Sequence, residues 1–349
     1  MKVLVTGATG FIGRHLVAAL LSRKETIRIL ARNVEQAEAI WSPGLLEVVR
    51  GDFANALTLG DLCEGVDIVF HLASGSFAEN DKTGEAEWLH QKVAVEGTKE
   101  LLRRAARAGV KRFIFVSSVK AMGEGGSSHL DEASPELPQS AYGRGKLAAE
   151  RAVLEAGRTY GMHVCNLRLP MVYGSDGKGN LPRMMAAIDR GWFPPLPEVK
   201  NRRSMVHVND VVQALLLTAE NPKASHQTYI VTDGCTYSSR QIYILLCQAL
   251  GRSIPGWRFP AGLLQMAAKA GDLAGWVLKR EVPLNSQVLY KLMGSAWYSC
   301  AKIQRELGYR PRYSLETALP EILKALCLVT SSQRSLALSP DRREEGKRS

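Results

Sequence analysis

Two side chains near the middle of the chain have the types and the spacing for proton transfer. Tyr142 and Lys146 are four residues apart in a segment with a helical pattern, so they project from the same face of one helix. A tyrosine hydroxyl has a pKa near 10, roughly, and a nearby ammonium favours its ionised form. We expect Tyr142 to exchange a proton with a substrate hydroxyl or carbonyl, and Ser118 to hydrogen-bond the same oxygen. A Tyr-x-x-x-Lys pair also arises often by chance, as an exposed pair on a helix, so the surrounding elements must decide.

A glycine-rich loop near the N-terminus supplies a second part of such a site. An apolar strand pattern runs directly into Gly7, Gly10 and Gly13, and a helical pattern follows. In this context Gly7 permits a tight turn, Gly10 lets the backbone approach a pyrophosphate, and Gly13 lets the helix pack closely on the strand. The partial positive charge of the helix N-terminus then faces the phosphates. The loop predicts a nicotinamide dinucleotide that exchanges hydride with the substrate.

The residue after the second strand bears on which dinucleotide binds. Sites that prefer NAD usually place an acid about 20 residues after the loop, on the ribose 2′-hydroxyl, whereas this chain has Arg32 there. A guanidinium pairs with a 2′-phosphate, so NADP is favoured over NAD, although a solvated arginine at a strand end gives the same pattern. Asp52 and Phe53, after the third strand, are expected to flank the adenine, and Lys146 to contact the nicotinamide ribose. The residues expected at the cofactor are Gly7, Thr9, Gly10, Phe11, Ile12, Gly13, Arg32, Asp52, Phe53, Leu72, Ala73, Ser74, Tyr142, Lys146, Pro170 and Val172.

Short apolar strand patterns alternate with helical patterns over the first two thirds of the chain. The strands are expected at residues 3–6, 27–31, 46–49, 68–72, 112–117, 164–169 and 228–232, and the helices at 12–23, 90–108, 142–160 and 209–220. Apolar strands that alternate with helices are typical of a parallel sheet buried on both faces. The sequence therefore predicts an α/β Rossmann fold with a doubly wound parallel sheet, whose strand ends carry the candidate residues.

The residue composition changes along the chain and indicates further divisions. Glycines and prolines crowd residues 171–202, and the later part of the chain is rich in helical patterns. We expect a Rossmann domain over residues 1–170 with 203–232 returning to it, and a substrate lobe made of 171–202 and 233–330. Residues 331–349 are polar and are expected to be a disordered tail.

Composition excludes several classes of protein. The 349 residues have 46% hydrophobic and 23% charged side chains, which is ordinary globular usage, and the net charge of +11 is scattered, which favours phosphorylated ligands over nucleic acid. The six cysteines form no C-x-x-C pair, so no metal site is expected, and with no signal-peptide pattern the protein is expected to be cytoplasmic. No apolar run is long enough to span a membrane. The closest, residues 259–278, is interrupted by Lys269 and Asp272 and is interpreted as a packed amphipathic helix or, less favoured, one on a membrane surface.

Four motifs make residues 1–325 resemble the extended short-chain dehydrogenase/reductase superfamily, in its NAD-dependent epimerase/dehydratase branch. They are Thr6–Gly13, the Ser118/Tyr142/Lys146 set, Arg168–Gly174 and Arg203–Val211. Family members commonly use an arginine such as Arg203 to grip a nucleotide-sugar diphosphate, and the basic loop around it suits one. The resemblance therefore implies a nucleotide-diphosphate sugar as substrate. Many members are dimers, so a homodimer through the helices at 90–108 and 142–160 is compatible with it.

The chain departs from the family pattern at informative places. Ala94 stands where many relatives have Asn, and the Thr-Asp-Glu group of the dehydratases is absent after Ser118, which argues against 4,6-dehydration. Residues 117–124 are similar to those of enzymes that reduce UDP-linked 4-keto-6-deoxy-2-acetamido sugars, as in UDP-N-acetylquinovosamine formation. The residues that this resemblance places at the substrate are Ser118, Lys120, Asn180 and Arg203, although Lys120 could equally be solvated.

Four hypotheses remain on the sequence alone. The first is a 4-keto reductase of a nucleotide-diphosphate sugar, and the second a UDP-glucose 4-epimerase-like enzyme that uses the same residues twice. The third is a Rossmann protein without chemistry, which the retention of both Tyr142 and Lys146 disfavours. The fourth is a dehydrogenase of a steroid 3β-hydroxyl, which Arg203 disfavours.

Overall fold

A computed structural model of the chain describes residues 1–337 except 43, 56–58, 74–90, 127, 176, 178–179, 279–281 and 283–284. Its centre is a seven-stranded sheet in the order β10-β7-β5-β4-β1-β2-β3, with every neighbouring pair parallel. These strands are β1 (Lys2–Thr6), β2 (Thr26–Ala31), β3 (Glu47–Arg50), β4 (Ile68–His71), β5 (Arg112–Ser118), β7 (His163–Leu169) and β10 (Gln227–Ile230). The chain starts at β1, winds outward to β3, and then returns past β1 to β4, so the strand order reverses between β1 and β4. Ligands of such sheets bind at this switch point, outside the carboxyl ends of the strands.

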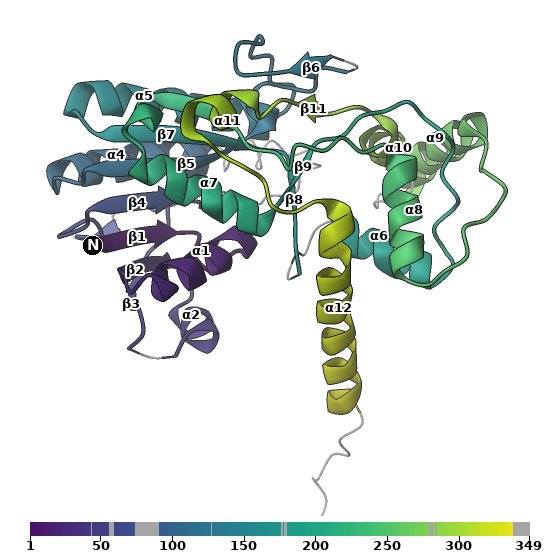
Figure 1. The fold of residues 1–349 in the computed structure, drawn as a ribbon, viewed down its shortest axis with the longest axis horizontal. Coiled ribbons are helices and arrows are strands. Elements are labelled where there is room, and N and C mark those ends of the chain that lie inside the picture. Colours follow the sequence, from purple (N-terminus) through teal and green to yellow (C-terminus); the bar gives the residue numbers. More distant parts are fainter. Residues whose placement is uncertain are drawn as a thin grey trace, which may run out of the picture.

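Helices cover both faces of the sheet (Figure 1). Helices α1 (Phe11–Ser22) and α7 (Val208–Glu220) bury one side against the sheet, in a cluster that includes Leu16, Val17, Val211 and Leu215. Helices α4 (Gly97–Arg107) and α5 (Ala141–Tyr160) pack on the other side, through a cluster that includes Leu101, Ala105, Ala149 and Val153. Because both faces are covered, the inner strands β1, β4 and β7 are buried along most of their length, and this explains their apolar runs.

A smaller lobe lies to the right of the sheet in Figure 1. Its helices are α6 (Asn180–Asp189), α8 (Ser239–Ala249), α9 (Ala261–Leu278), α10 (Ser286–Met293) and the start of α12 (Leu315–Ala337). A separate hydrophobic cluster holds α6, α8 and α12 together, with Leu181, Met185, Leu246 and Leu319 among its members. Two small parallel sheets bridge the lobe to the domain, and they pair β8 (Met171–Tyr173) with β9 (Met205–His207) and β6 (His129–Leu130) with β11 (Trp297–Tyr298).

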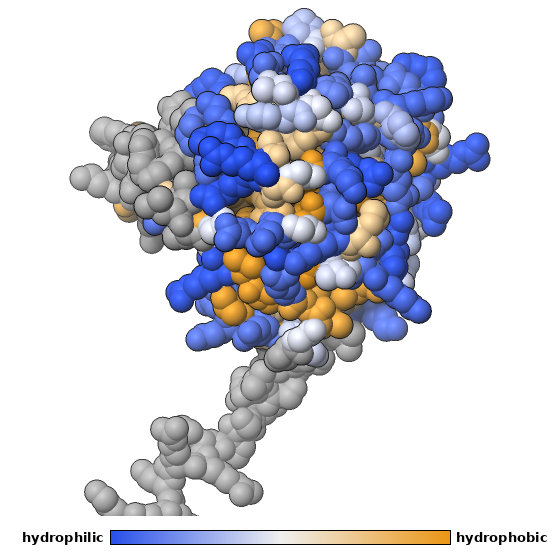
Figure 2. All heavy atoms as spheres, turned by 90° about the vertical axis from the view of Figure 1, so that its left-hand side faces the viewer, coloured by the Kyte–Doolittle hydropathy of each residue, from blue (hydrophilic) through white to orange (hydrophobic). Residues whose placement is uncertain are grey.

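The remaining elements are short. They are α2 (Val34–Ile40), the π-helix η2 (Gln91–Glu96), the 3-10 helices η3 (Val119–Ala121) and η4 (Pro222–Ala224), and α11 (Ala301–Leu307). The face that carries the left-hand end of the sheet is mostly hydrophilic, with apolar side chains gathered in its lower part (Figure 2). Among the described residues, no helix combines the length and the apolar composition that crossing a bilayer requires.

The α/β Rossmann fold is confirmed, and each expected strand and helix has a counterpart within a few residues of its predicted ends. The C-terminal end differs from the expectation. Residues 331–337 are helical, since α12 continues to Ala337, so the disordered tail does not begin at residue 331. The physical reason is that an established helix adds each further residue at little cost, which a polar composition does not prevent. Residues 338–349 lie outside the described part of the chain.

Candidate active site

The loop between β1 and α1 leaves no room for side chains at Gly7 and Gly13. Gly7 has a φ of +72°, and a Cβ there would come within 2.8 Å of backbone atoms of Leu72 and Ala73. A Cβ on Gly13 would come within 2.7 Å of the Cα of Ala8, so only glycine lets α1 start this close to the strand. Gly10 is the N-cap of α1, and no side chain caps the helix. The N-terminus of α1 therefore has the open, uncapped form that suits the phosphates of a dinucleotide.

The candidate catalytic residues come from two adjacent elements. Ser118 ends β5 and is the N-cap of η3, where its hydroxyl accepts a hydrogen bond from the Lys120 backbone N–H at 3.3 Å. Tyr142 lies in the first turn of α5, which is capped by the Ser140 side chain through the Gly143 N–H at 3.1 Å. The two elements are pressed together, because a Cβ on Gly143 would come within 3.1 Å of the carbonyl carbon of Lys120. This close contact brings Tyr142 to the end of β5, next to η3.

Lys146 is fully buried beneath Tyr142. Its Nζ donates a hydrogen bond to the Val116 carbonyl at 2.8 Å and lies 4.6 Å from the centre of the Phe115 ring and 6.0 Å from that of Tyr142. Burial lowers the pKa of Lys146 to about 8, and the Glu150 carboxylate, one turn further along α5, opposes this shift. The ammonium is therefore held at one position beside the phenol ring, as the four-residue spacing predicts.

A second ammonium lies near the same tyrosine. The Nζ of Lys120 is 5.8 Å from the centre of the Tyr142 ring. The family resemblance alone places Lys120 at the substrate, and the sequence allows solvent as an equal alternative. Its position beside Tyr142 could have been anticipated only from the contact between η3 and α5, which joins residues more than twenty positions apart.

The residues expected at the cofactor lie along the carboxyl edge of the sheet. Thr6 pairs with Leu30 in the parallel register, so the exposed Arg32 follows β2 at the level where the glycine loop begins. Leu72 and Ala73 follow β4 and contact Gly7, whereas Ser74 lies outside the described residues. Pro170 and Val172, at the junction of β7 and β8, are half-buried.

Asp52 and Phe53 follow β3. The Asp52 carboxylate accepts a hydrogen bond from the Ala54 N–H at 3.0 Å, whereas the Phe53 ring is buried 5.1 Å from the imidazole of His71. A Cβ on Gly97 would come within 2.8 Å of the Phe53 Cβ, so the phenylalanine is enclosed by α4. The Phe53 side chain thus belongs to the core.

His71 has a structural position that orders the strand ends. Its ring is hydrogen-bonded to the Thr6 hydroxyl at 2.7 Å and to the Thr98 hydroxyl at 2.9 Å. Burial lowers the pKa of His71 to about 3, with a smaller contribution from the Lys146 ammonium. His71 is therefore neutral at physiological pH, and it ties β1, β4 and α4 together beside the glycine loop.

On the substrate side, Arg203 precedes β9 and forms isolated bridges with Tyr237 and Ala296. Its guanidinium donates to the Gly294 carbonyl at 2.9 Å, and burial lowers its pKa, an effect that the nearby Glu124 opposes. Arg203 thus lies between the lobe and the segment that follows η3. Asn180 begins α6, and its side chain lies outside what the structure describes.

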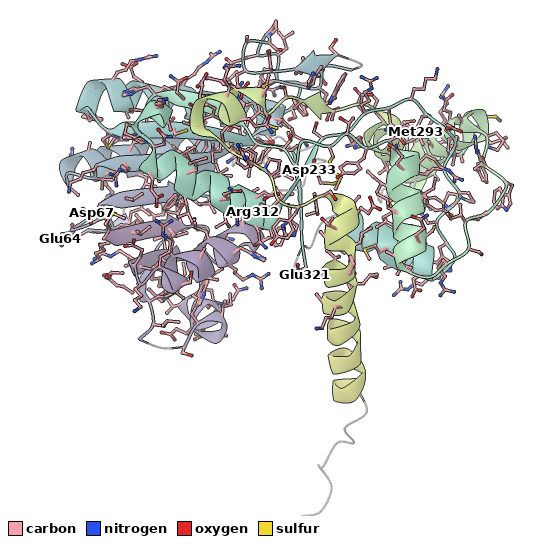
Figure 3. All side chains as sticks on the ribbon, viewed as in Figure 1. Glu64, Asp67, Asp233, Met293, Arg312 and Glu321 are labelled. Atoms are coloured by element: carbon pink, nitrogen blue, oxygen red, sulfur yellow. The ribbon has the colours of Figure 1, made fainter. Side chains whose placement is uncertain are left out.

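A buried carboxylate that the sequence analysis missed connects the lobe to the domain. Asp233, near the centre of Figure 3, accepts hydrogen bonds from the Tyr173 and Tyr237 hydroxyls, each at 3.0 Å. Burial raises the pKa of Asp233 to about 6. The Tyr237 hydroxyl also accepts from the Leu315 N–H at 2.9 Å, so this cluster reaches the start of α12.

A second buried group missed by the sequence analysis supports α5. The Arg168 guanidinium on β7 binds the Glu150 carboxylate through both Nε, at 3.0 Å, and Nη2, at 2.6 Å, and also pairs with Glu136. Arg168 and Glu150 are almost completely buried. The motif Arg168–Gly174 drew attention to the arginine, but nothing in the sequence indicated that Glu150 is its partner.

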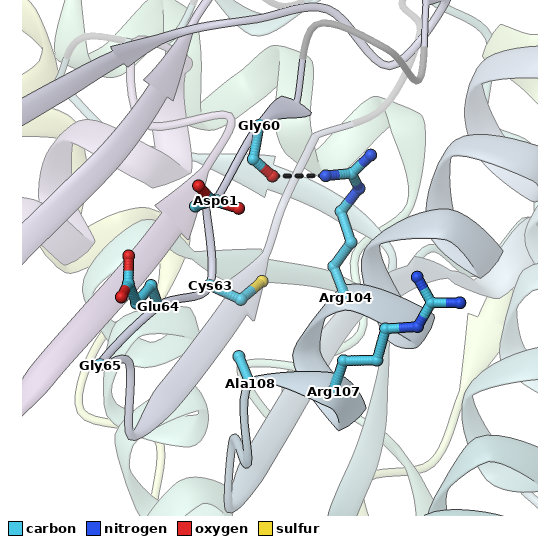
Figure 4. Close-up of a pocket in the computed structure, with 8 residues that line it drawn as sticks. All are labelled: Gly60, Asp61, Cys63, Glu64, Gly65, Arg104, Arg107 and Ala108. Atoms are coloured by element: carbon cyan, nitrogen blue, oxygen red, sulfur yellow. Dashed lines mark hydrogen bonds between the residues drawn. The ribbon is translucent and has the colours of Figure 1, made fainter.

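A cavity of about 460 Å³ lies away from these residues. Cys63, Arg104 and Arg107 are among its lining residues, and Arg104 donates a hydrogen bond to the Gly60 carbonyl (Figure 4). It opens where α4 ends and before β4 begins, which is the amino edge of the sheet. Glu64 and Asp67, which mark this edge, lie at the far left of Figure 3, away from Asp233. The cavity is therefore separate from the candidate active site.

Comparisons with known proteins agree with this fold. The model of the NAD dependent epimerase/dehydratase family matches residues 3–232. A UDP-glucose 4-epimerase from Vibrio cholerae is 29% identical over 93% of this chain and 95% of its own length. A 3-beta-hydroxysteroid dehydrogenase from Mycolicibacterium neoaurum is 28% identical over 92% of this chain and 90% of its own. The crystal structure of a UDP-glucose 4-epimerase from Thermotoga maritima with UDP-glucose superposes with a TM-score of 0.75 at 22% identity, covering 95% of this chain and 100% of that one, and shares the fold.

Proposed function

Since the chain belongs to the NAD dependent epimerase/dehydratase family and is an NAD(P)-dependent enzyme of the extended short-chain dehydrogenase/reductase type, we propose that it acts at C4 of a nucleotide-diphosphate sugar. The favoured reaction is reduction of a UDP-4-keto-6-deoxy-hexosamine. The observation that carries the proposal is the placement of Tyr142 over the buried Lys146 and beside the end of β5.

In the proposed reaction, the hydride and the proton come from two different groups. A bound nicotinamide cofactor supplies the hydride that C4 accepts. Tyr142 donates its hydroxyl proton to the C4 oxygen, and the ketone becomes a secondary alcohol. Ser118 donates a hydrogen bond to the same oxygen and orients the carbonyl. Lys146 favours the phenolate that remains on Tyr142, because its ammonium is fixed beside the ring.

Two features support a nucleotide-diphosphate sugar. Arg203 lies between the lobe and the domain, where a diphosphate that spans them would meet it. The segment after Ser118 lacks the Thr-Asp-Glu group of the dehydratases, which argues against 4,6-dehydration. We propose Ser118, Lys120, Asn180 and Arg203 as substrate contacts, and NADP as the preferred cofactor because of Arg32.

The test is a direct assay of the purified chain. It is incubated with a UDP-4-keto-6-deoxy-N-acetylhexosamine and NADPH, and the loss of NADPH absorbance is followed together with the mass of the sugar product. The expected product is heavier than the ketone by two hydrogens. No oxidation of NADPH or NADH with any nucleotide 4-ketosugar would contradict the reductase proposal.

A 4-epimerase is the second candidate, and the resemblance to the Vibrio cholerae enzyme favours it. An epimerase removes hydride from C4 and returns it to the opposite face, so it turns over without added cofactor and leaves no net redox change. Conversion of UDP-glucose or its N-acetylated analogue to the C4 epimer by the protein as purified would identify this activity.

A steroid-type 3β-hydroxy dehydrogenase is the lesser candidate, and the resemblance to the Mycolicibacterium neoaurum enzyme favours it. It uses the same Tyr142 and Lys146. A calorimetric titration separates the two substrate classes, since UDP binds only if the diphosphate site around Arg203 exists.

A further inference from the structure

The Lys146 ammonium occupies a place that does not suit a charge. The side chain is 2% exposed, and its Nζ lies 4.6 Å from the centre of the Phe115 ring. Its hydrogen bond goes to a neutral group, the Val116 carbonyl, at 2.8 Å. A buried ammonium without an opposite charge is unfavourable, and such a group tends to lose its proton instead. The role of Lys146 beside Tyr142 needs that proton, so a counter-charge is required.

Glu150 is placed to supply this counter-charge. It follows Lys146 by four residues in α5, and residues at this spacing lie on one face of a helix with their Cβ atoms about 5–6 Å apart. The Lys146 side chain reaches β5 at Val116. The Glu150 side chain reaches the neighbouring strand, β7, at Arg168. Glu150 is also 2% exposed, so water does little to screen its carboxylate from the ammonium.

Arg168 keeps the Glu150 carboxylate ionised. Its guanidinium donates to Glu150 from Nε at 3.0 Å and from Nη2 at 2.6 Å, and such charge-assisted bonds favour the charged form. The same guanidinium also pairs with Glu136, which is 35% exposed. Two cations and two carboxylates therefore alternate from the active site toward the surface, in the order Lys146, Glu150, Arg168 and Glu136. In this arrangement each buried charge has an opposite charge beside it.

The other titratable groups described around Lys146 supply no negative charge to it. On β4, His71 is neutral, since burial lowers its pKa to about 3. On η3, Lys120 carries a positive charge near the same phenol. The acidic side chains of Glu96 and Glu100, at the start of α4, pair with basic residues of α4 itself. The carboxylate one turn further along α5 is therefore the negative charge that acts on the ammonium.

We propose that Glu150 is a positioning residue of the proposed reaction, whose buried carboxylate keeps Lys146 in its ammonium form beside the Tyr142 phenol. The inference rests on the proposed function only for the part that Tyr142 has in the reaction. Burial lowers the pKa of Lys146 to about 8, and Glu150 opposes this shift. Without the carboxylate, Lys146 would lose its proton at a lower pH, and the phenol would lose its partner at physiological pH.

The titration of Lys146 tests the proposal without any substrate or cofactor. Protein isotope-labelled at the lysine ε-carbons is titrated with base and followed by NMR, and the signal of Lys146 is the one that is missing in Lys146→Met. In Glu150→Gln we expect the midpoint to fall by about one pH unit or more, because an opposite charge is removed while Arg168 stays. Arg168→Met breaks the same ion pair but leaves Glu150 charged, so its midpoint should not fall.

The double variant Glu150→Gln/Arg168→Met keeps the proposal testable if Glu150→Gln does not fold, because it removes the two buried charges together. Its midpoint should lie about one pH unit below that of Arg168→Met, from which it differs only at residue 150. The control is Glu155→Gln, on the exposed side of the same helix, which should titrate as the unchanged protein does. Circular dichroism checks that each variant is folded.

The decline of kcat/KM at high pH should begin at a lower pH in Glu150→Gln than in the unchanged enzyme. The proposal is overturned if Glu150→Gln and the double variant leave the midpoint of Lys146 where it was. It is also overturned if Glu150→Gln and Arg168→Met lower the midpoint equally, as a loss of packing alone would. If the midpoints move as expected but the protein reduces no nucleotide 4-ketosugar, the proposed function is wrong and the action of Glu150 on Lys146 stands.

Discussion

Gly143 and the backbone carbonyl of Lys120 lie in direct contact, with no space between them for a side chain. This contact sets the distance between the first turn of α5, which carries Tyr142, and η3, which begins at the cap residue Ser118. The relative position of the two proposed catalytic hydroxyls therefore depends on a glycine that touches neither of them.

The variant Gly143→Ala tests this dependence. The added methyl group must push α5 away from η3, and we expect kcat to fall by roughly tenfold or more, because small displacements of catalytic groups are costly. The matched control is Gly262→Ala, since Gly262 is also helical and has open space around it. That change should leave kcat as it is. Equal kcat values for Gly143→Ala and the unchanged enzyme would show that the spacing is not critical.

Replacement of Tyr142 by phenylalanine removes the proposed proton donor and little else. We expect kcat to fall by about 100-fold or more, the usual contribution of a general acid, while NADPH binding measured by fluorescence titration stays the same. Tyr160→Phe is the control, because Tyr160 is exposed at the other end of the same helix. An unchanged kcat in Tyr142→Phe would show that Tyr142 is not the proton donor.

The pH dependence of kcat/KM should reflect Lys146. Because burial lowers the pKa of Lys146 to about 8, its ammonium is present below that pH and is lost as the pH rises through it. We expect kcat/KM, which reports the free enzyme, to fall above about pH 8. The slow residual reaction of Lys146→Met should lack this decline. A profile that stays level well past pH 8 in the unchanged enzyme would show that the ammonium is not required.

Arg32 is expected to set the preference between the two cofactors. Removing its guanidinium in Arg32→Ala should lower kcat/KM for NADPH by roughly tenfold, the value of one charge-assisted hydrogen bond, and leave that for NADH almost unchanged. Arg107→Ala is the control, since Arg107 is exposed at the opposite edge of the sheet. If Arg32→Ala lowers kcat/KM equally for NADPH and NADH, the arginine does not contact the 2′-phosphate.

The buried pair of Arg168 and Glu150 should be needed for stability. In Glu150→Gln the guanidinium stays buried without its main counter-charge, and we expect the free energy of unfolding to fall by about 3–5 kcal/mol. Urea denaturation measures this change. The control, Glu155→Gln on the exposed side of the same helix, should change it by less than about 0.5 kcal/mol. A small change in the free energy of unfolding for Glu150→Gln would mean that Glu136 or water compensates the buried guanidinium.

The sequence predicted well those features that depend on residues close together in the chain. Gly7, Gly10 and Gly13 lie within one loop, and Tyr142 and Lys146 within one turn of helix, so local geometry is enough to place them. The ends of the strands were predicted to within a few residues because their apolar runs are bounded by turns and helices.

The features that escaped prediction join residues far apart in the chain. Lys120 reaches Tyr142, Arg168 finds Glu150, and Asp233 collects Tyr173 and Tyr237, and each of these contacts exists only once the elements pack. Phe53 is expected to flank the adenine together with Asp52, and only the packing of α4 shows that its ring lies in the core. Helix α9 is apolar in sequence, and only the structure shows that the face with Leu264 and Ala268 is the one that α10 covers.

The Asp233 cluster has a consequence for how the protein is made. The segment after α11 completes the join between lobe and domain, since the Arg312 and Tyr313 N–H groups bind the Asp210 carboxylate and the Leu315 N–H binds Tyr237. These contacts come from residues that follow every strand of the central sheet in the chain. During translation the nascent polypeptide can form its sheet early, but the contacts that join the two halves must wait until residues 312–315 have left the ribosome.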